Sequence, residues 1–511
     1  MLLRNWFENV KSSCALNSLK ARRRSPLRKR EFSPCFQAAE VMEERRLLSA
    51  GVVATPSAAI NGAAAALAVS SNAQGPTAGD VVAAGKFTFQ QINLVSDQAG
   101  VAQNLDPTLV NAWGISAAPN SGAFWVSSNG GGLSELYLGD VNGSALTQPF
   151  KVTIPGGSPT GQVFNINQPA MGTGNSTDFS VTDGTNTGAS VFLFASKTGA
   201  ITGWNPGVGT PMPTAFGPLS TEAEVGFQAT DGAVFTGLAA GDVGTAHFLY
   251  AADFHNGTID VVDGQFHNVA LGANGFGTFT DPHLSKGFAP FNVQNLGGKL
   301  YVTYAQQDAA RDGGSVAGHG KGFVDVFDTS GHLLQRVATR GQLDAPWGVA
   351  IAPSGFGKFG GDLLVGNFGD GHIDAYDPTH HFAFAGQLKG ADGKPVTISG
   401  LWGLQFGNGA SAGDANSLYF SAGPAHGTHG LFGSLHAVPG HNGDDGDQGD
   451  GRADLGGDSA ASLNASGGAL SAAVGSSDLQ TFTPGDSGSE MGLLHSTASH
   501  RHRSIGTTMR S

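Results

Sequence analysis

Short apolar runs separated by glycine-rich turns recur along the chain from about Phe87 to Pro439. Each run is rich in β-branched and aromatic residues, and no apolar pattern of helical period extends for a useful length. Runs of this kind predict short β-strands joined in antiparallel hairpins. The clearest run of each unit occurs six times, at Phe124–Val126, Val191–Phe194, Phe248–Tyr250, Leu300–Val302, Leu363–Val365 and Leu418–Phe420. The body is therefore expected to be all-β.

The strand pattern repeats with a period of about 55 residues. Three units contain a Trp-Gly pair, Trp113-Gly114, Trp347-Gly348 and Trp402-Gly403, and two units contain degenerate versions around Thr236 and Phe291. Thr236 to Phe291 spans 55 residues, Phe291 to Trp347 spans 56, and Trp347 to Trp402 spans 55. The 123 residues from Trp113 to Thr236 leave room for two units and an insertion. A fixed period of this size predicts a β-propeller, here with six blades that begin near residues 111, 162, 233, 289, 345 and 400.

The first strand has no partner within the first unit. Phe87–Leu94 precedes that unit, whereas the last unit, near Leu431–Val438, has room for an outer strand. We therefore predict that residues 87–94 complete the last blade, because closing the ring removes exposed sheet edges. The Trp-Gly pairs are expected to be structural, with Trp packing between neighbouring blades and Gly allowing close approach of the backbone.

The two ends of the chain differ from the body in composition. Residues 1–85 read as a basic leader and residues 440–511 as an acidic tail rich in Gly and Ser, both disordered, which leaves residues 86–439 for the propeller. Residues 1–50 hold 11 basic and 5 acidic residues, and the remainder holds 16 and 35. The acidic remainder argues against nucleic acid as a partner.

Both cysteines, Cys14 and Cys35, lie in the leader, so the body has no disulfide and no thiolate site. No run of 18 apolar residues is present, so no transmembrane helix is predicted.

The residues also carry two resemblances. The stretch Met42–Ala50 resembles the LEPR-XLL motif found near the start of many large exported bacterial proteins, with a departure at its Pro. The stretch from Gln91 through Asn111–Ile115 to Gly400–Leu404 resembles an uncharacterised family of exported bacterial proteins related to NHL-type six-bladed propellers. These resemblances imply a propeller over roughly residues 87–437 and an exported protein, located in the periplasm, at the cell surface or outside the cell. They imply no catalytic residues.

Polar residues near the ends of equivalent strands are the candidate ligand site. They are Asn129, Lys197, Asp253, Gln306 and Asn367, drawn from five units, and they are expected at the mouth of the central channel. Asn and Asp oxygens suit a hard cation such as Ca²⁺. The alternative is that these residues form turns, since Asn and Asp bond their own backbone and several are closely followed by Gly.

Two hypotheses follow for function. The first is a non-catalytic binding or scaffold propeller, monomeric, whose partner is a small molecule, a glycan or a protein. The second is a metal-dependent, lactonase-like hydrolase at the channel mouth. The second lacks a glutamate at the end of an inner strand and a general base that can be placed near the metal, so the first is favoured.

Overall fold

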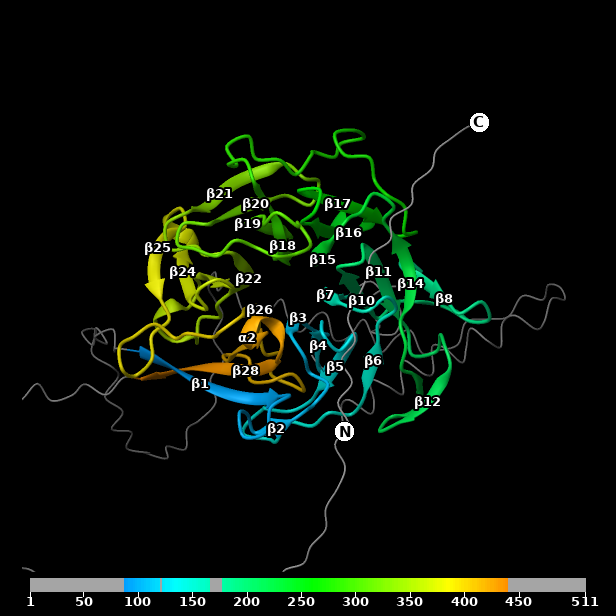
Figure 1. Ribbon diagram of the computed structural model, residues 1–511, viewed down its shortest axis with the longest axis horizontal. Helices are drawn as coiled ribbons and strands as arrows, with labels where there is room; N and C mark the ends of the chain where they lie inside the picture. Colours follow the sequence, from blue (N-terminus) through cyan, green and yellow to red (C-terminus); the bar gives the residue numbers. More distant parts are fainter. Residues whose placement is uncertain (1–86, 120–121, 166–176, 440–511) are drawn as a thin grey trace, which may run out of the picture. The chain divides into compact units, whose positions relative to one another are not determined.

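The structure is a computed structural model that describes residues 87–119, 122–165 and 177–439. The leader expected over 1–85 and the tail expected over 440–511 lie outside these residues. The strands of the described ranges form six blade sheets around a central channel (Figure 1), which confirms the six-bladed propeller. We number the blades I to VI in chain order. No helix in these ranges has the length and apolar character required to cross a membrane.

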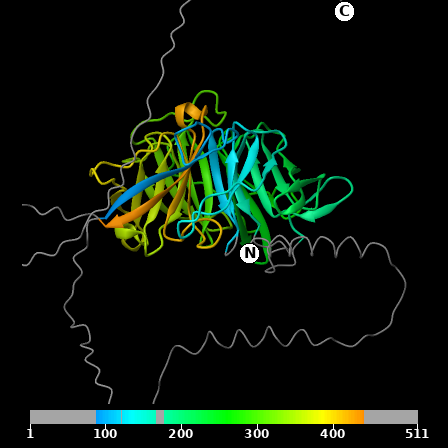
Figure 2. The ribbon, with the colours of Figure 1, turned by 90° about the horizontal axis from the view of Figure 1, so that it is seen from below.

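Each blade contributes one strand to the channel wall. These inner strands are β3 (Ala112–Ala117), β7 (Pro159–Phe164), β15 (Phe235–Val243), β18 (Phe288–Leu296), β22 (Pro346–Ile351) and β26 (Leu401–Phe406). Their starts agree with the expected unit starts to within a few residues. Because consecutive inner strands run in the same direction, their starts share one face of the ring, the start face, and their ends share the other, the end face. In the side view of Figure 2 the blade strands run between these faces.

The second strands are the apolar runs that the sequence identified. They are β4 (Phe124–Ser128), β10 (Phe192–Ser196), β16 (Ala246–Asp253), β19 (Lys299–Gln306), β23 (Leu363–Asn367) and β27 (Leu418–Ala422). β4, β10, β23 and β27 are buried along their whole length. Such continuous apolar runs are typical of strands covered on both faces, as neighbouring blades cover them here.

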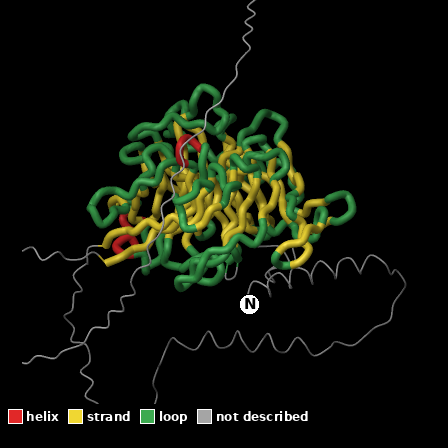
Figure 3. The backbone as a smooth tube through the Cα atoms, turned by 60° about the horizontal axis from the view of Figure 1, so that its bottom comes forward, coloured by secondary structure: helices red, strands yellow, loops and turns green. Residues whose placement is uncertain are grey.

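The remaining strands lie toward the outside of the ring. Third strands are β5 (Leu133–Tyr137), β11 (Ala200–Trp204), β17 (Thr258–Asp263), β20 (Gly322–Phe327), β24 (Ile373–Asp377) and β28 (Leu431–Pro439). Outer strands are β6 (Lys151–Thr153), β14 (Glu224–Gln228), β21 (Leu333–Thr339) and β25 (Ala383–Gln387). Blade III has three strands among the described residues. In Figure 3 the loops gather at the two faces of the ring.

The expected insertion in the second unit is confirmed. Two small hairpins interrupt blade II: β8 (Ser180–Thr182) with β9 (Thr187–Ala189), and β12 (Pro211–Thr214) with β13 (Gly217–Ser220). The short helical elements of the described ranges are η4 (Gly357–Phe359), η5 (Pro378–His380) and α2 (Pro424–Gly427). In α2, Ala425 and His426 have positive φ angles of 52° and 58°.

The predicted ring closure is also confirmed. β1 (Phe87–Ser96) pairs antiparallel with β28 over its whole length, from Phe87 opposite Pro439 to Ser96 opposite Leu431. The short β2 (Asn104–Leu105) adds a fifth strand to blade VI. The first strand of the ring is thus held by the last, and the blade leaves no unpaired edge at β28.

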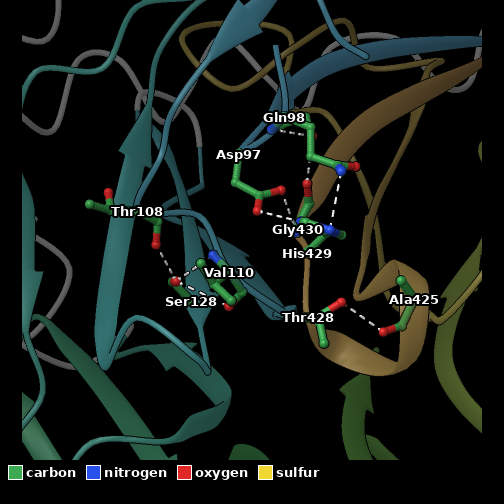
Figure 4. A network of polar contacts seen from close by, with 10 residues as sticks. Asp97, Gln98, Thr108, Val110, Ser128, Ala425, Thr428, His429 and Gly430 are labelled. Atoms are coloured by element: carbon green, nitrogen blue, oxygen red, sulfur yellow. Dashed lines mark hydrogen bonds and ion pairs between the residues drawn. The ribbon is translucent and has the colours of Figure 1, made fainter. Parts of the chain in front are cut away.

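Polar contacts fix the closing strand where it meets the start face (Figure 4). The Asp97 carboxylate lies 2.8 Å from the His429 Nδ1 atom and accepts the Gly430 N–H at 2.9 Å. The Gln98 amide lies 3.1 Å from the other ring nitrogen of His429. These contacts join residues more than 330 positions apart in sequence, so they form only when the ring closes.

Candidate functional site

The start-face end of the channel is filled by aromatic side chains, which we call the aromatic plug. Its members are Trp113, Phe254, Phe291, Trp347, Phe368 and Trp402. The Trp113 and Trp402 rings stack with centroids 3.7 Å apart. The Phe368 ring also stacks with Trp402, at a centroid distance of 4.1 Å. Trp113 also meets Trp347, two blades away, at 6.3 Å. The tryptophans therefore meet at the centre of the ring, in addition to contacting the neighbouring blade as expected.

The glycine that follows each Trp has the predicted role. A Cβ atom at Gly114 would collide with the carbonyl oxygen of Thr160, and one at Gly348 with that of Trp402. At Gly403 it would lie 2.8 Å from the Trp113 carbonyl oxygen. In each case the obstacle is the backbone of the next inner strand, which cannot move aside. Glycine at this position therefore permits the close approach of adjacent blades.

The five predicted ligand residues come to the start face but occupy three different register positions. Asp253 and Asn367 pair with the first residues of β15 and β22. Asn129 and Lys197 come one residue after the corresponding positions, Ser128 and Ser196. In blade IV the inner strand begins two residues earlier, so the residue equivalent to Pro346 is Pro290, which precedes Phe291 and pairs with Tyr304. Gln306 lies two residues beyond Tyr304 and pairs with Phe288. Because side chains alternate in direction along a strand, these five do not all project the same way.

Asp253 and Asn367 are buried and their side chains are used within their own blades. The Asp253 carboxylate accepts the N–H groups of Val234 and His255, at 3.1 and 3.0 Å, and that of Asn256. The Asn367 amide accepts the Asp344 N–H at 3.0 Å and donates to the Asp374 carboxylate at 2.9 Å. The Asp253 contacts with His255 and Asn256 form the turn that the sequence offered as the alternative, whereas Asn367 bonds residues 23 and 7 positions away. Oxygens engaged in this way do not fit the ligand set of a Ca²⁺ ion.

Asn129 and Lys197 share their register position with Phe254 and Phe368 of the plug. The Asn129 amide donates to the Pro159 carbonyl at 3.1 Å and accepts from Asn111 at 3.3 Å. The Lys197 side chain lies beneath Gly313, in the loop between β19 and β20: a Cβ there would lie 3.1 Å from Lys197 Cε. The same Cβ would lie 3.3 Å from Thr236, so this loop reaches blades II and III. Plug and loop together occupy the predicted channel mouth, and the assignment of ligand residues there stays a prediction.

A cavity of about 310 Å³ lies on the other side of the plug, along the ends of the inner strands. Trp347 forms part of its wall next to the plug. The remaining wall comes mainly from Ile115–Ala117, Gln162–Asn165, Leu238–Asp242, Val293–Asn295 and Leu404–Gln405. The cavity thus faces the end face, opposite to the face on which the sequence placed the site.

Carboxamide side chains of the cavity wall tie neighbouring inner strands together. Gln162 donates to the Gly114 carbonyl at 2.9 Å and accepts from Ser134 at 2.9 Å. Asn292 donates to the Trp347 carbonyl at 2.9 Å, and Asn295 donates to the Ala240 carbonyl at 2.8 Å. The Gln405 amide, oriented so that both its nitrogen and its oxygen have partners, donates to the Ile115 carbonyl at 3.1 Å and accepts the Ala117 N–H at 3.3 Å. We call these four side chains the amide belt; they fix the wall of the cavity before any ligand arrives.

Ser116 differs from the belt. It lines the cavity, it is 7% exposed, and its hydroxyl has no hydrogen-bond partner among the described residues. A buried hydroxyl without a partner is costly, and such groups commonly meet a water or a ligand. The sequence reasoning missed Ser116, although a signal was present. It stands three residues after Trp113, where the other Trp-Gly units have Ala350 and Gln405.

The rim of the cavity carries its charged groups. His247 Nδ1 lies 2.7 Å from the Asp242 carboxylate, and His247 Nε2 lies 3.9 Å from the carboxylate of Asp178. Of the described residues that line the cavity, none is Lys or Arg. In the described part of the chain, this rim included, no group of three or more His, Cys, Asp or Glu has the arrangement of a metal site.

A buried carboxyl pair lies outside the channel, where β2 leads into blade I. Glu135 is fully buried and Asp106 is 5% exposed. Thr108 donates its N–H to Asp106 at 3.1 Å and its hydroxyl to Glu135 at 2.8 Å, and Tyr137 donates to Asp106 at 2.7 Å. Burial, together with the charge of Asp106, raises the pKa of Glu135 to about 7. This pair joins the closing segment to the first blade.

Comparison with known proteins gives relatives without an assigned activity. The chain is 33% identical over 354 residues to the uncharacterised protein R648 of Acanthamoeba polyphaga mimivirus, covering 68% of this chain and 80% of that protein. It is 30% identical over 352 residues to the uncharacterised protein L690 of the same virus, covering 68% and 86%. No protein-family model matches the chain.

Solved propeller structures are similar at low identity. Virginiamycin B lyase from Staphylococcus aureus is 12% identical, with a TM-score of 0.37, covering 69% of this chain and all of that one. The gluconolactonase XC5397 from Xanthomonas campestris is 16% identical, with a TM-score of 0.29, covering 48% and 82%. At these values the likeness carries no information about activity.

Proposed function

The chain belongs to the protein family that includes the mimivirus proteins R648 and L690, and from the geometry of its channel we propose that it is a binding module for a small molecule. One observation carries the proposal. A preformed cavity of about 310 Å³ lies in the ring, and its wall combines apolar side chains with carboxamides that neighbouring strands hold in place. Small-molecule sites are concave, largely preformed, and hold a few fixed polar groups among apolar ones. The module acts as a monomer in this proposal.

A ligand screen on the full-length protein tests this function. Ligands that enter the cavity raise the melting temperature, since they bind only the folded state. Gln294→Trp should abolish the effect by filling the cavity, because Gln294 is a partly exposed wall residue with room to project inward. Asn129→Ala, on the far side of the plug, is the matched control and should bind normally.

The screen can also contradict the proposal. If no compound stabilises the wild-type protein, or if Gln294→Trp binds the same compounds unchanged, the cavity is not a ligand site. A circular dichroism spectrum and a melting curve of each variant separate loss of binding from loss of fold.

Export is the second part of the proposal. It is supported by the LEPR-XLL-like stretch Met42–Ala50 and by the acidic body. Recovery of the full-length chain outside the cytoplasm of a bacterial host, compared with a chain lacking residues 1–85, tests it. Equal retention of both chains in the cytoplasm would contradict it.

The alternative, a metal-dependent hydrolase at the start face, gains no support from the residues proposed for it. The oxygens of Asp253 and Asn367 already accept hydrogen bonds within their blades. Metal analysis of the purified protein and its melting temperature with and without Ca²⁺ decide between the two functions. A stoichiometric ion would favour the hydrolase over the binding module.

A further inference from the structure

Resting on the proposed small-molecule function, we infer that the cavity ligand is a neutral, polyhydroxylated molecule of monosaccharide size that enters from the end face. Entry from the start face is blocked because Trp113, Trp402 and Phe368 are stacked across the channel there. On the same face, the loop between β19 and β20 lies against Lys197 and Thr236. The end-face side of the plug carries the cavity.

The size of the ligand follows from the size of the cavity. Its volume of about 310 Å³ is near the lower end of the range for small-molecule sites. A single sugar ring, with about a dozen non-hydrogen atoms, suits a site at this end of the range. An oligosaccharide or a peptide chain does not fit without projecting beyond the rim.

The charge of the ligand follows from the lining. No Lys or Arg is present among the described residues that line the cavity, so an anion would be desolvated without a counter-charge. The carboxylate of the lining, Asp242, is already in contact with His247 at 2.7 Å. A cationic ligand would have to compete with that imidazole. A neutral ligand meets neither penalty.

The polar character of the ligand follows from Ser116 and the amide belt. The Ser116 hydroxyl can donate and accept, and both capacities are unused in the described structure. A carboxamide has two N–H donors and two lone pairs, so Asn292 and Gln405 keep capacity after bonding the neighbouring strands. A purely apolar ligand would leave these groups buried without partners, which is costly.

An apolar surface is needed as well. Trp347, Leu404 and Phe248 line the same cavity as Ser116. A sugar ring presents C–H groups on its faces and hydroxyls around its edge. The C–H face suits the aromatic wall, and the hydroxyl edge suits Ser116 and the belt. This combination distinguishes a sugar-like polyol from a small neutral amide or an alcohol with one hydroxyl.

Isothermal titration calorimetry on the full-length protein tests the class with matched probes. The neutral probes are D-glucose, D-galactose and D-mannose. Their uronic acids supply the anion, D-glucosamine and D-galactosamine the cation, and cyclohexanol the apolar ring. At least one neutral hexose should bind at least tenfold more tightly than the corresponding uronate, the amino sugars and cyclohexanol. Ser116→Ala should weaken this binding by about tenfold, the effect of one hydrogen bond to a buried group. Phe384→Ala, at an exposed position on the outside of the ring, should leave it unchanged.

The outcomes separate this inference from the function on which it rests. Equal or tighter binding of a uronate, an amino sugar or cyclohexanol overturns the neutral polyol, as does binding of none of the probes. If the broader screen still finds compounds that Gln294→Trp excludes, the binding function stands and only the ligand class is wrong. If hexose binding is unchanged in both Ser116→Ala and Gln294→Trp, the sugar binds elsewhere and the inference also fails.

Discussion

The two ends of the channel are built from the same six strands and differ in what fills them. Near the start face the inward positions of three inner strands are Trp113, Trp347 and Trp402, with Phe291 from a fourth, and the rings pack against one another. Three residues further along, the equivalent residues that line the cavity are Ser116, Val163, Ala239, Gln294 and Gln405. These smaller side chains cannot span the ring, so a cavity remains. Residue volume at one repeat position therefore decides whether a propeller channel is core or site.

The two ends also use polar groups differently. The start face engages the side chains of Asp253 and Asn367 in turns and blade contacts. At the cavity the belt amides bond the backbones of neighbouring blades, and the Ser116 hydroxyl has no partner among the residues that the structure describes. Polar residues at equivalent positions of the repeat are thus a poor guide to a ligand site, because turns and contacts between blades use the same residue types.

Removing one ring from the plug should give the largest effect. Trp402→Ala removes a ring that stacks on both Trp113 and Phe368. We expect a loss of about 3–5 kcal/mol in the free energy of unfolding, since the surrounding rings cannot collapse into the cavity that is left. Guanidinium unfolding at equilibrium measures it. Phe384→Ala, at a side chain that is 48% exposed, should cost less than about 1 kcal/mol. Equal losses in the two variants would show that the plug is not core.

The buried carboxyl pair supplies a pH effect that the plug lacks. The pKa of Glu135 is raised from 4.5 to about 7, so the folded state binds this proton more tightly than the unfolded state. Its stabilising contribution is complete below pH 4.5 and is lost as the pH rises toward 7. Glu135→Gln should remove up to about 3 kcal/mol of that decline.

Unfolding measured from pH 4.5 to 8 checks this expectation. The difference between wild type and Glu135→Gln should grow with pH and favour the variant above pH 7. The difference for Trp402→Ala should stay constant over the same range. A flat difference for Glu135→Gln would mean that burial and the charge of Asp106 do not raise the pKa of this carboxyl in the folded state.

Cutting one member of the amide belt should give a smaller effect. Gln162→Met keeps the length of the side chain but removes the donor to Gly114 and the acceptor for Ser134. We expect a loss of about 1–3 kcal/mol, because both partners stay buried without a bond. Thermal unfolding compared with Gln90→Met, at an exposed position of β1, measures it. A loss no larger than that of Gln90→Met would mean that backbone packing alone holds blades I and II together.

Much of the architecture could be predicted because it is periodic. The 55-residue spacing located the inner strands of blades III to VI, the Trp-Gly pair located that of blade I, and the 123-residue gap left room for blade II. The unpaired run Phe87–Leu94 identified the closing strand. The glycine after each Trp was assigned to close backbone approach, and this too is confirmed. These features depend on the local strand pattern, which the linear sequence shows directly, and on the general rule that sheet edges are covered.

The candidate site could not be predicted in the same way. Asn129, Lys197, Asp253, Gln306 and Asn367 look equivalent in sequence, but bulges shift the pairing of β4, β10, β16, β19 and β23 with their inner strands. A shift of one residue reverses the direction of a side chain. Ser116 follows a structural motif and carries no charge, so its place in the repeat, three residues after Trp113, was its only signal in the sequence.

The sequence by itself determined the strands, the number of blades and the ring closure, because strand pattern and repeat period are properties of neighbouring residues. Only the tertiary structure decided which end of the channel is open. That outcome depends on the combined volume of six side chains contributed by residues up to 289 positions apart, from Trp113 to Trp402. It depends also on which carboxamides find a partner on the next blade. Such quantities exist only once the ring is closed.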